Sequence, residues 1–174
     1  PQLDGKRAVP ALSGTVTVTR DANGVPTLSG ANRLDLAYAT GFLHGQERFF
    51  QMDLLRRSAA GELAELFGSK AVPVDRAHRL HRFRARAAEV LASMRPDERL
   101  FIERYAAGVN EGLNALGARP FEYALSGAAP RPWTPADSLL VVWAMYFDLQ
   151  GNQEPRELAR EWLARHLDPA QRAF

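Results

Sequence analysis

Cysteine is absent from this chain of 174 residues, which excludes disulfides, thiolate nucleophiles, zinc fingers and iron–sulfur clusters. Lysine is nearly absent too, because Lys6 and Lys70 are the only two and arginine carries the remaining positive charge. The formal net charge of +2 is small for a nucleic-acid-binding protein, so we predict no nucleic-acid partner. The sequence lacks an apolar run of about eighteen residues, so we predict no membrane span. Its first ten residues lack the apolar core of a signal peptide, which fits a chain made without one or a processed chain.

The motifs of self-contained enzymes are missing as well. The sequence has no G-x-S-x-G elbow, no P-loop, no G-x-G-x-x-G and no H-E-x-x-H. His78 and His81 have a spacing that could bring both to one metal ion, but the arginines of residues 76–86 surround them and repel a cation. No pair of acids is set apart for glycosidase chemistry. If this chain belongs to an enzyme, another polypeptide is therefore expected to bring the nucleophile.

Patterns of apolar residues and turn signals predict an α+β chain that is mainly helical. Hydrophobic residues make up 46% of the sequence, which is enough for a folded core. After an irregular lead-in over residues 1–13, alternating β-branched residues and the Asn23-Gly24 pair predict a strand hairpin over residues 14–30. We expect one domain, 1–174, whose remaining elements are helices over residues 32–68 (interrupted at Gly61), 75–94, 96–116, 135–150 and 155–174.

The least polar segment of the chain is Leu139–Phe147, which follows a helix start at Thr134 and Pro135. It has no polar face, so we expect it to be buried on all sides, as core or as the wall of a pocket. Gly108 and Gly112 share one ridge of the 96–116 helix, where a neighbouring backbone could approach closely.

The spacing of the arginines predicts ion pairs and also allows an arginine-rich binding face. Arg56 and Arg57 precede Glu62 and Glu65, which suggests ion pairs across the helix break at Gly61. The arginines of residues 76–86 form either a solvated face or pairs with acids of another segment. A freestanding helical binding module with an arginine-rich face is therefore the alternative to an enzyme subunit.

Five motifs in order point to a known family. They read V-T-R-D-A-N-G-V-P (18–26), G-F-L-H-G-Q-E-R-F-F-Q-M-D (41–53), R-R-S-A-A-G-E-L-A-E-L-F-G (56–68), Y-A-A-G-V-N (105–110) and P-W-T-P-A-D (132–137). With this order and spacing, the chain resembles the α (small) subunit of the penicillin acylase family, which includes penicillin G acylases and acyl-homoserine lactone acylases. The resemblance covers about residues 14–160.

The resemblance implies a function that needs a second chain. It implies an αββα N-terminal-nucleophile hydrolase fold, completed by a β subunit that autoproteolytic processing releases from the same precursor. The implied enzyme is a periplasmic heterodimer that hydrolyses the linear amide bond of acyl-homoserine lactones, penicillins or both, as in quorum quenching or antibiotic resistance. Its nucleophile is the N-terminal serine of the β subunit, whose α-amine titrates near neutrality and acts as base. No catalytic residue is then expected on this chain.

The resemblance also implies where this chain meets substrate and metal. Phe147 matches a phenylalanine of the family's acyl pocket, Tyr146 stands where penicillin G acylases have an arginine, and Trp143 matches a pocket-lining methionine. These residues suit a fatty or aromatic acyl chain of a small-molecule substrate. The family binds structural calcium partly through one α-subunit glutamate, which Glu154 matches best, with Glu157 nearby.

Overall fold

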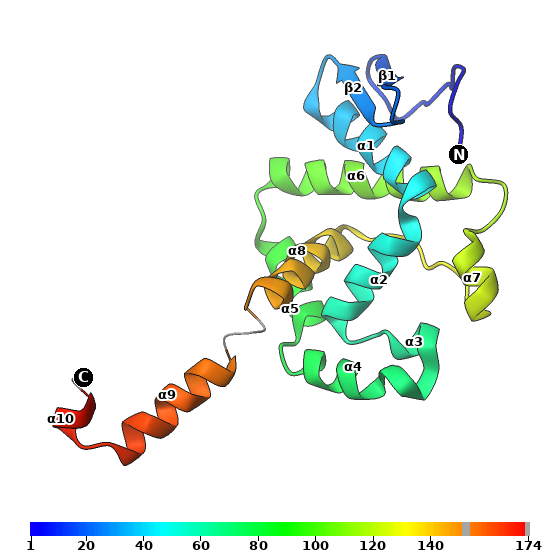
Figure 1. The fold of residues 1–174 in the computed structure, drawn as a ribbon. Helices are drawn as coiled ribbons and strands as arrows, with labels where there is room; N and C mark the ends of the chain where they lie inside the picture. Colours follow the sequence, from blue (N-terminus) through cyan, green and yellow to red (C-terminus); the bar gives the residue numbers. More distant parts are fainter. Residues whose placement is uncertain (151–153, 173–174) are drawn as a thin grey trace.

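The computed structural model describes residues 1–150 and 154–172, which form one antiparallel hairpin and a series of helices (Figure 1). The strands are β1 (Val16–Arg20) and β2 (Pro26–Gly30), as the mainly helical α+β prediction requires. The helices are α1 (Arg33–Glu47), α2 (Phe49–Ala60), α3 (Ala64–Phe67), the 3-10 turn η1 (Gly68–Ala71), α4 (Val72–Arg79), α5 (Phe83–Ser93), α6 (Pro96–Asn114), α7 (Phe121–Ser126), α8 (Pro135–Gln150), α9 (Glu154–His166) and α10 (Pro169–Arg172).

The loop of the hairpin is longer than the sequence suggested. The strands are joined by residues 21–25, and the Oδ1 atom of Asp21 accepts hydrogen bonds of 2.9 Å from the backbone N–H groups of Asn23 and Val25. Gly24 has a φ of 79°, which favours glycine. The predicted hairpin is thus present, but Asn23-Gly24 lies within a longer loop organised by Asp21 and does not form a tight turn alone.

Helices α1 and α6 cross with their backbones in close contact. A Cβ atom on Gly108 would lie 2.0 Å from the carbonyl oxygen of Tyr38, and Gly112 is equally crowded by α1. Gly41 and Gly45 of α1 face α6 in the same way. The ridge predicted on α6 therefore serves a helix crossing, which Figure 1 shows below the hairpin.

The single helix predicted over residues 75–94 is wrong, because the chain breaks between α4 and α5. Arg82 has a φ of 54°, a left-handed conformation that is uncommon for a side chain of this size. The break lets Asp75 of α4 accept hydrogen bonds at the start of α3 while Phe83 of α5 turns into the core. In one straight helix, Asp75 and Phe83 could not both reach these positions. Tertiary packing therefore overrides helix propensity at this break.

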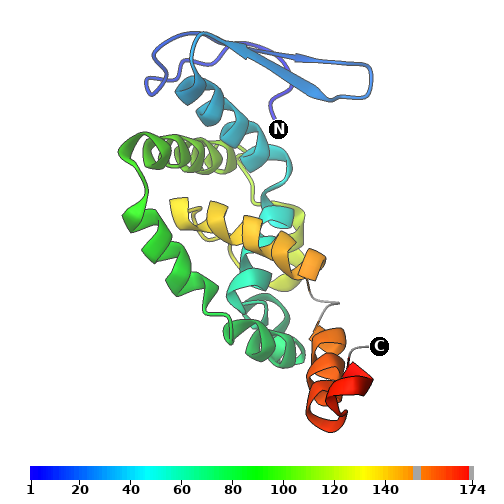
Figure 2. The same cartoon turned by 90° about the vertical axis from the view of Figure 1, so that its left-hand side faces the viewer.

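Other helix ends differ from the prediction in smaller ways. The 32–68 segment is divided at Arg48 as well as at the predicted interruption, Gly61, which has a left-handed φ of 69°. The predicted loop after α6 contains the short helix α7. The predicted last helix is divided into α9 and α10, and α9 projects away from the other helices in Figures 1 and 2.

The segment Leu139–Phe147, which was expected to be buried on all sides, is covered on one face only within this structure. Leu140 and Ala144 are buried against α2 and α5. Val142 and Met145 on the other side of α8 are 64% and 61% exposed. The described elements cover only one face of this apolar helix and leave the other face exposed. None of the described helices is both long enough and apolar enough to span a membrane.

Candidate functional site

The P-W-T-P-A-D motif fixes the first turn of α8, the helix that carries the predicted substrate-binding residues. The Asp137 carboxylate accepts hydrogen bonds of 2.7 Å from both the backbone N–H and the hydroxyl of Thr134, so it reaches back to cap the first turn as the acid of a capping box does. Trp133 is buried, and its backbone N–H and C=O pair with the Asn110 amide at 2.7 and 2.8 Å. The start of α8 is thereby attached to α6.

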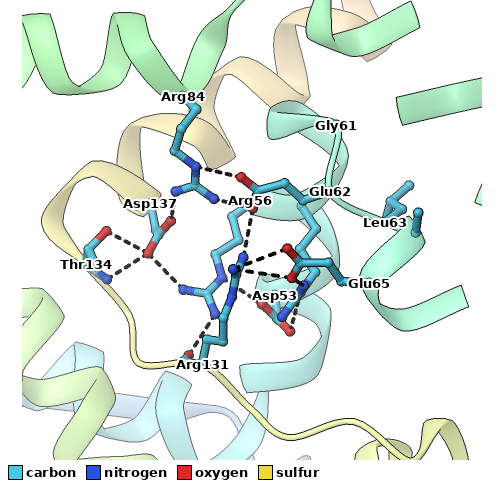
Figure 3. A network of polar contacts seen from close by, with 12 residues as sticks. Asp53, Arg56, Gly61, Glu62, Leu63, Glu65, Arg84, Arg131, Thr134 and Asp137 are labelled. Atoms are coloured by element: carbon cyan, nitrogen blue, oxygen red, sulfur yellow. Dashed lines mark hydrogen bonds and ion pairs between the residues drawn. The ribbon is translucent and has the colours of Figure 1, made fainter. Parts of the chain in front are cut away.

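A buried ionic network joins this turn to α2 (Figure 3). Arg56 donates from Nη1 to Asp137 at 2.8 Å and from Nε to Asp53 at 2.7 Å, and all three side chains are almost fully buried. Arg56 also donates to the backbone carbonyls of Arg131 and Pro132. Every side of the guanidinium therefore meets an oxygen, which offsets the cost of burying its charge.

Asp53 is the second centre of the network. Its carboxylate accepts hydrogen bonds from Arg56, from Arg57 at 2.9 Å and from the hydroxyl of Tyr123 at 2.7 Å. Burial and the Asp53 charge raise the pKa of the Tyr123 hydroxyl well above its usual range. Arg57 continues to Glu65 at 2.5 Å, which is one of the ion pairs predicted across the helix break.

Glu62 pairs with Arg84 and Arg131 rather than with Arg56 or Arg57, and Arg84 is one of the residue 76–86 arginines for which pairs with acids of another segment were expected as one of two outcomes. Arg84 of α5 binds both Glu62 (2.6 Å) and Asp137 (2.6 Å), and Arg131 also binds Glu62 (2.8 Å). Burial opposes ionisation of Glu62 and Asp137, but their arginine partners outweigh it and lower the pKa of both carboxyls. Glu62 and Asp137 are thus held ionised by their partners, and the network as a whole supports the site structurally.

The predicted residue Phe147 lies within a cluster of aromatic rings. Its ring stacks on the imidazole of His78, with centroids 4.3 Å apart and planes 19° apart. His81 meets it edge-on at 4.8 Å, and Phe83 lies 5.0 Å away. The two histidines considered as metal ligands therefore pack around an aromatic ring.

The other two predicted residues approach the same cluster. Trp143 lies 5.0 Å from Phe83, and Tyr146, which is 48% exposed, lies 6.2 Å from it. The structure thus brings Trp143, Tyr146 and Phe147 together on the side of α8 that meets α5. Sequence reasoning missed Phe83 and His78 as their neighbours, since both lie far away in the chain.

The calcium prediction falls on a side chain that the structure leaves undescribed. Glu154 begins α9, but its side chain lies outside the described part, and Glu157 is exposed. Within the described residues, no group of three or more histidines and acids could hold a metal ion. Calcium takes about six to eight oxygen ligands, of which Glu154 alone could supply one or two.

Comparison with known proteins defines the class to which this architecture belongs. The profile of the penicillin amidase family matches residues 15–174. The chain is 38% identical over 145 residues to penicillin acylase 2 proenzyme of Pseudomonas sp. (strain SE83), which covers 82% of this chain and 18% of that protein. It is 34% identical over 165 residues to acyl-homoserine lactone acylase QuiP of Pseudomonas fluorescens (strain Pf0-1), covering 94% and 20% respectively. This chain therefore belongs to the penicillin amidase family.

A solved structure shows which part of such a protein the chain matches. A chain of thermostable penicillin G acylase from Alcaligenes faecalis superposes with a TM-score of 0.75 and 28% identity, covering 93% of this chain and 89% of that chain. The chain thus spans about a fifth of the length of its curated relatives but nearly all of one chain of a solved acylase. This extent is consistent with the small subunit of the family, which pairs with a β subunit.

Proposed function

We propose that this chain is the α subunit of a periplasmic, heterodimeric N-acyl amide hydrolase that acts on acyl-homoserine lactones, penicillins or both. The observation that carries the proposal is the correspondence of nearly the whole chain to one chain of a penicillin G acylase. The relatives named as a penicillin acylase and an acyl-homoserine lactone acylase support both substrate classes. The β subunit of the same precursor would complete the αββα fold against the exposed face of α8.

The proposed reaction uses the N-terminal serine of the β subunit as nucleophile. Its Oγ attacks the amide carbonyl carbon, and the proton of the hydroxyl passes to the α-amine of the same serine. When the tetrahedral intermediate collapses, the C–N bond breaks, the proton moves to the leaving amine, and a serine ester remains. Water then cleaves the ester and releases the carboxylic acid. This chain contributes binding and support to the reaction and no reacting group.

In this proposal, Phe147, Tyr146 and Trp143 form one wall of the acyl pocket. Their rings gather on one side of α8, and the exposed face of that helix continues from them toward the second chain. An apolar wall favours a fatty or aromatic acyl group over a charged one. Because Tyr146 replaces the arginine of penicillin G acylases, the wall carries no cation for the carboxylate of penicillin. We therefore expect acyl-homoserine lactones to be the better substrates.

We also propose that Glu154 supplies one ligand to a structural calcium ion. A carboxylate oxygen is a ligand type that calcium prefers. At the start of α9, just after α8, the ion would help to tie the two chains together. No step of the reaction requires it.

The proposal is tested by producing the chain with and without the remainder of its precursor. The assembled enzyme should hydrolyse a panel of acyl-homoserine lactones and an aromatic-acyl penicillin, whereas the chain alone should be inactive. The isolated chain should also aggregate or remain molten, because the face of Val142 and Met145 stays in water. A soluble, cooperatively unfolding chain that purifies without a partner would instead support the freestanding binding module.

A further inference from the structure

We infer that His78 is a positioning residue for acyl-chain selection, because its imidazole holds the Phe147 ring in place while being anchored to helix α2. The inference rests on the proposed function, in which Phe147 lines the acyl pocket. The inference adds His78, a residue of helix α4, which contacts the Phe147 ring of the proposed pocket wall.

The contact between the two rings is the closest of the aromatic cluster around Phe147. The centroids of the His78 and Phe147 rings lie 4.3 Å apart and the planes are 19° from parallel, so one ring covers a face of the other. His81 and Phe83 meet Phe147 at 76° and 39°, at 4.8 and 5.0 Å. Because the near-parallel stack covers one face of the Phe147 ring, it restricts the tilt of that ring about its side-chain bonds.

His78 is itself fixed by a short hydrogen bond. Its Nδ1 atom lies 2.6 Å from the backbone carbonyl oxygen of Ser58. A carbonyl oxygen can only accept, so the proton of this bond lies on Nδ1. Ser58 belongs to the last turn of α2, and its carbonyl oxygen accepts from the Gly61 backbone N–H at 3.1 Å as well as from His78. The imidazole is thus oriented by the same helix that carries Arg56 and Arg57.

The strained turn between α4 and α5 completes the support. Arg82, with its φ of 54°, separates His81 from Phe83, and both of these residues contact Phe147. A left-handed arginine persists only where the surrounding packing holds it. Helix α4, the turn and the start of α5 therefore present three rings to Phe147, and the His78 ring among them is hydrogen-bonded to α2.

Positioning and plain packing predict different results for enzyme variants. If His78 only fills space, its removal lowers kcat/KM by the same factor for every substrate. If it positions Phe147, its removal changes the dependence of kcat/KM on acyl-chain length, as removal of the Phe147 ring does. Two residues that act through one contact should also show non-additive effects.

The experiment uses the assembled enzyme and a series of acyl-homoserine lactones from short to long chains. His78→Ala should shift the ratio of kcat/KM between long and short chains by roughly two- to tenfold, the factor that one aromatic pair is worth. Phe147→Ala should shift the ratio in the same direction, and the double variant should shift it no further than Phe147→Ala alone. Leu80→Ala, on the same segment and 83% exposed, is the matched control and should leave the ratio unchanged.

Two further variants separate the stack from the anchor. His78→Phe keeps a ring and should retain most of the dependence of kcat/KM on acyl-chain length. His78→Asn keeps an N–H group but no ring, and should change this dependence as His78→Ala does. If His78→Ala fails to mature, the comparison of His78→Phe with His78→Asn still tests whether His78 positions Phe147. A shift with Phe147→Ala but none with His78→Ala or His78→Asn would overturn the inference alone. An unchanged profile for Phe147→Ala would overturn the proposed pocket wall, and the role of His78 with it.

Discussion

Arg56 and Asp137 form a buried ion pair with an Nη1–Oδ2 distance of 2.8 Å, although they are separated by 81 positions in the chain. The pair connects the middle of α2 to the first turn of α8. The direction in which α8 leaves this turn decides where Trp143 and Phe147 lie. A contact without any chemical role in hydrolysis is therefore a condition for forming the proposed acyl pocket.

Asp137→Asn should strongly destabilise the enzyme. The substitution removes the charge that compensates Arg56 and Arg84, and breaking a buried pair in this way costs about 3–5 kcal/mol. Thermal unfolding of the assembled enzyme measures the effect. The control is Asp97→Asn, whose side chain is 72% exposed and should change stability by less than about 0.5 kcal/mol. Equal melting temperatures for the two variants would show that the network is dispensable.

Gly108→Ala should separate α1 from α6. The added methyl group would lie 2.0 Å from the Tyr38 carbonyl oxygen, so the backbones must move apart, at a cost of about 1–3 kcal/mol or more. Gly14→Ala is the control, since its nearest neighbour would be Asp35 at an ordinary 3.9 Å. Soluble yield and unfolding temperature of the assembled enzyme report the difference. A Gly108→Ala enzyme as stable as the Gly14→Ala enzyme would contradict the close crossing.

Asp35 should make the stability of the lead-in depend on pH in the acid range. Burial opposes its charge, but hydrogen bonds from Ser13, Asn32 and Gly14 outweigh burial and lower the pKa of Asp35 from 3.8 to about 2. Because the folded-state pKa lies below the unfolded value, the carboxylate stabilises the fold above about pH 4, and this stabilisation is lost as the pH falls toward 2.

Asp35→Asn removes this titration. As the pH falls over the same range, the free energy of unfolding of the variant should therefore decrease less steeply than that of the unaltered enzyme. Unfolding of both enzymes by denaturant at a series of pH values gives the two curves. Curves that stay parallel from about pH 5 to pH 2 would assign the acid sensitivity to other groups.

Glu154→Gln should impair maturation or lower the thermal stability of the assembled enzyme. The variant keeps the side-chain volume but removes one negative charge from the proposed calcium shell. Bound calcium, measured by elemental analysis, and the yield of processed chains are the readouts. Glu157→Gln serves as the neighbouring control. Unchanged metal content and processing in Glu154→Gln would place this glutamate on the surface.

Much of the fold could be predicted from local signals. The hairpin follows from alternating β-branched residues, and the start of α8 follows from the Thr134-Pro135-Ala136-Asp137 cap. The close approach on α6 follows from the spacing of Gly108 and Gly112. The break at Arg82 has no such signal, since neither glycine nor proline marks it, and the cause is the packing of Phe83 beneath α8.

The candidate site also has a part that could be predicted from local signals and a part that depends on tertiary packing. Trp143, Tyr146 and Phe147 could be assigned to one helix, because they lie in a single apolar segment that follows a recognisable motif. The stack of His78 on Phe147 depends on how α4 meets α8, which no local pattern encodes. The exposed half of α8 agrees with the sequence, because a chain of mostly helices has too few elements to cover a helix that is apolar all round.

The most direct test of the account is the identity of the first residue of the chain that purifies with this one. The central claim is that the nucleophile belongs to a second polypeptide, released from the same precursor, whose α-amine acts as base. N-terminal sequencing of that partner should find serine, and blocking its α-amine should abolish hydrolysis of every amide substrate. A partner that begins with a residue lacking a nucleophilic side chain, in a complex that still hydrolyses acyl-homoserine lactones, would contradict the account.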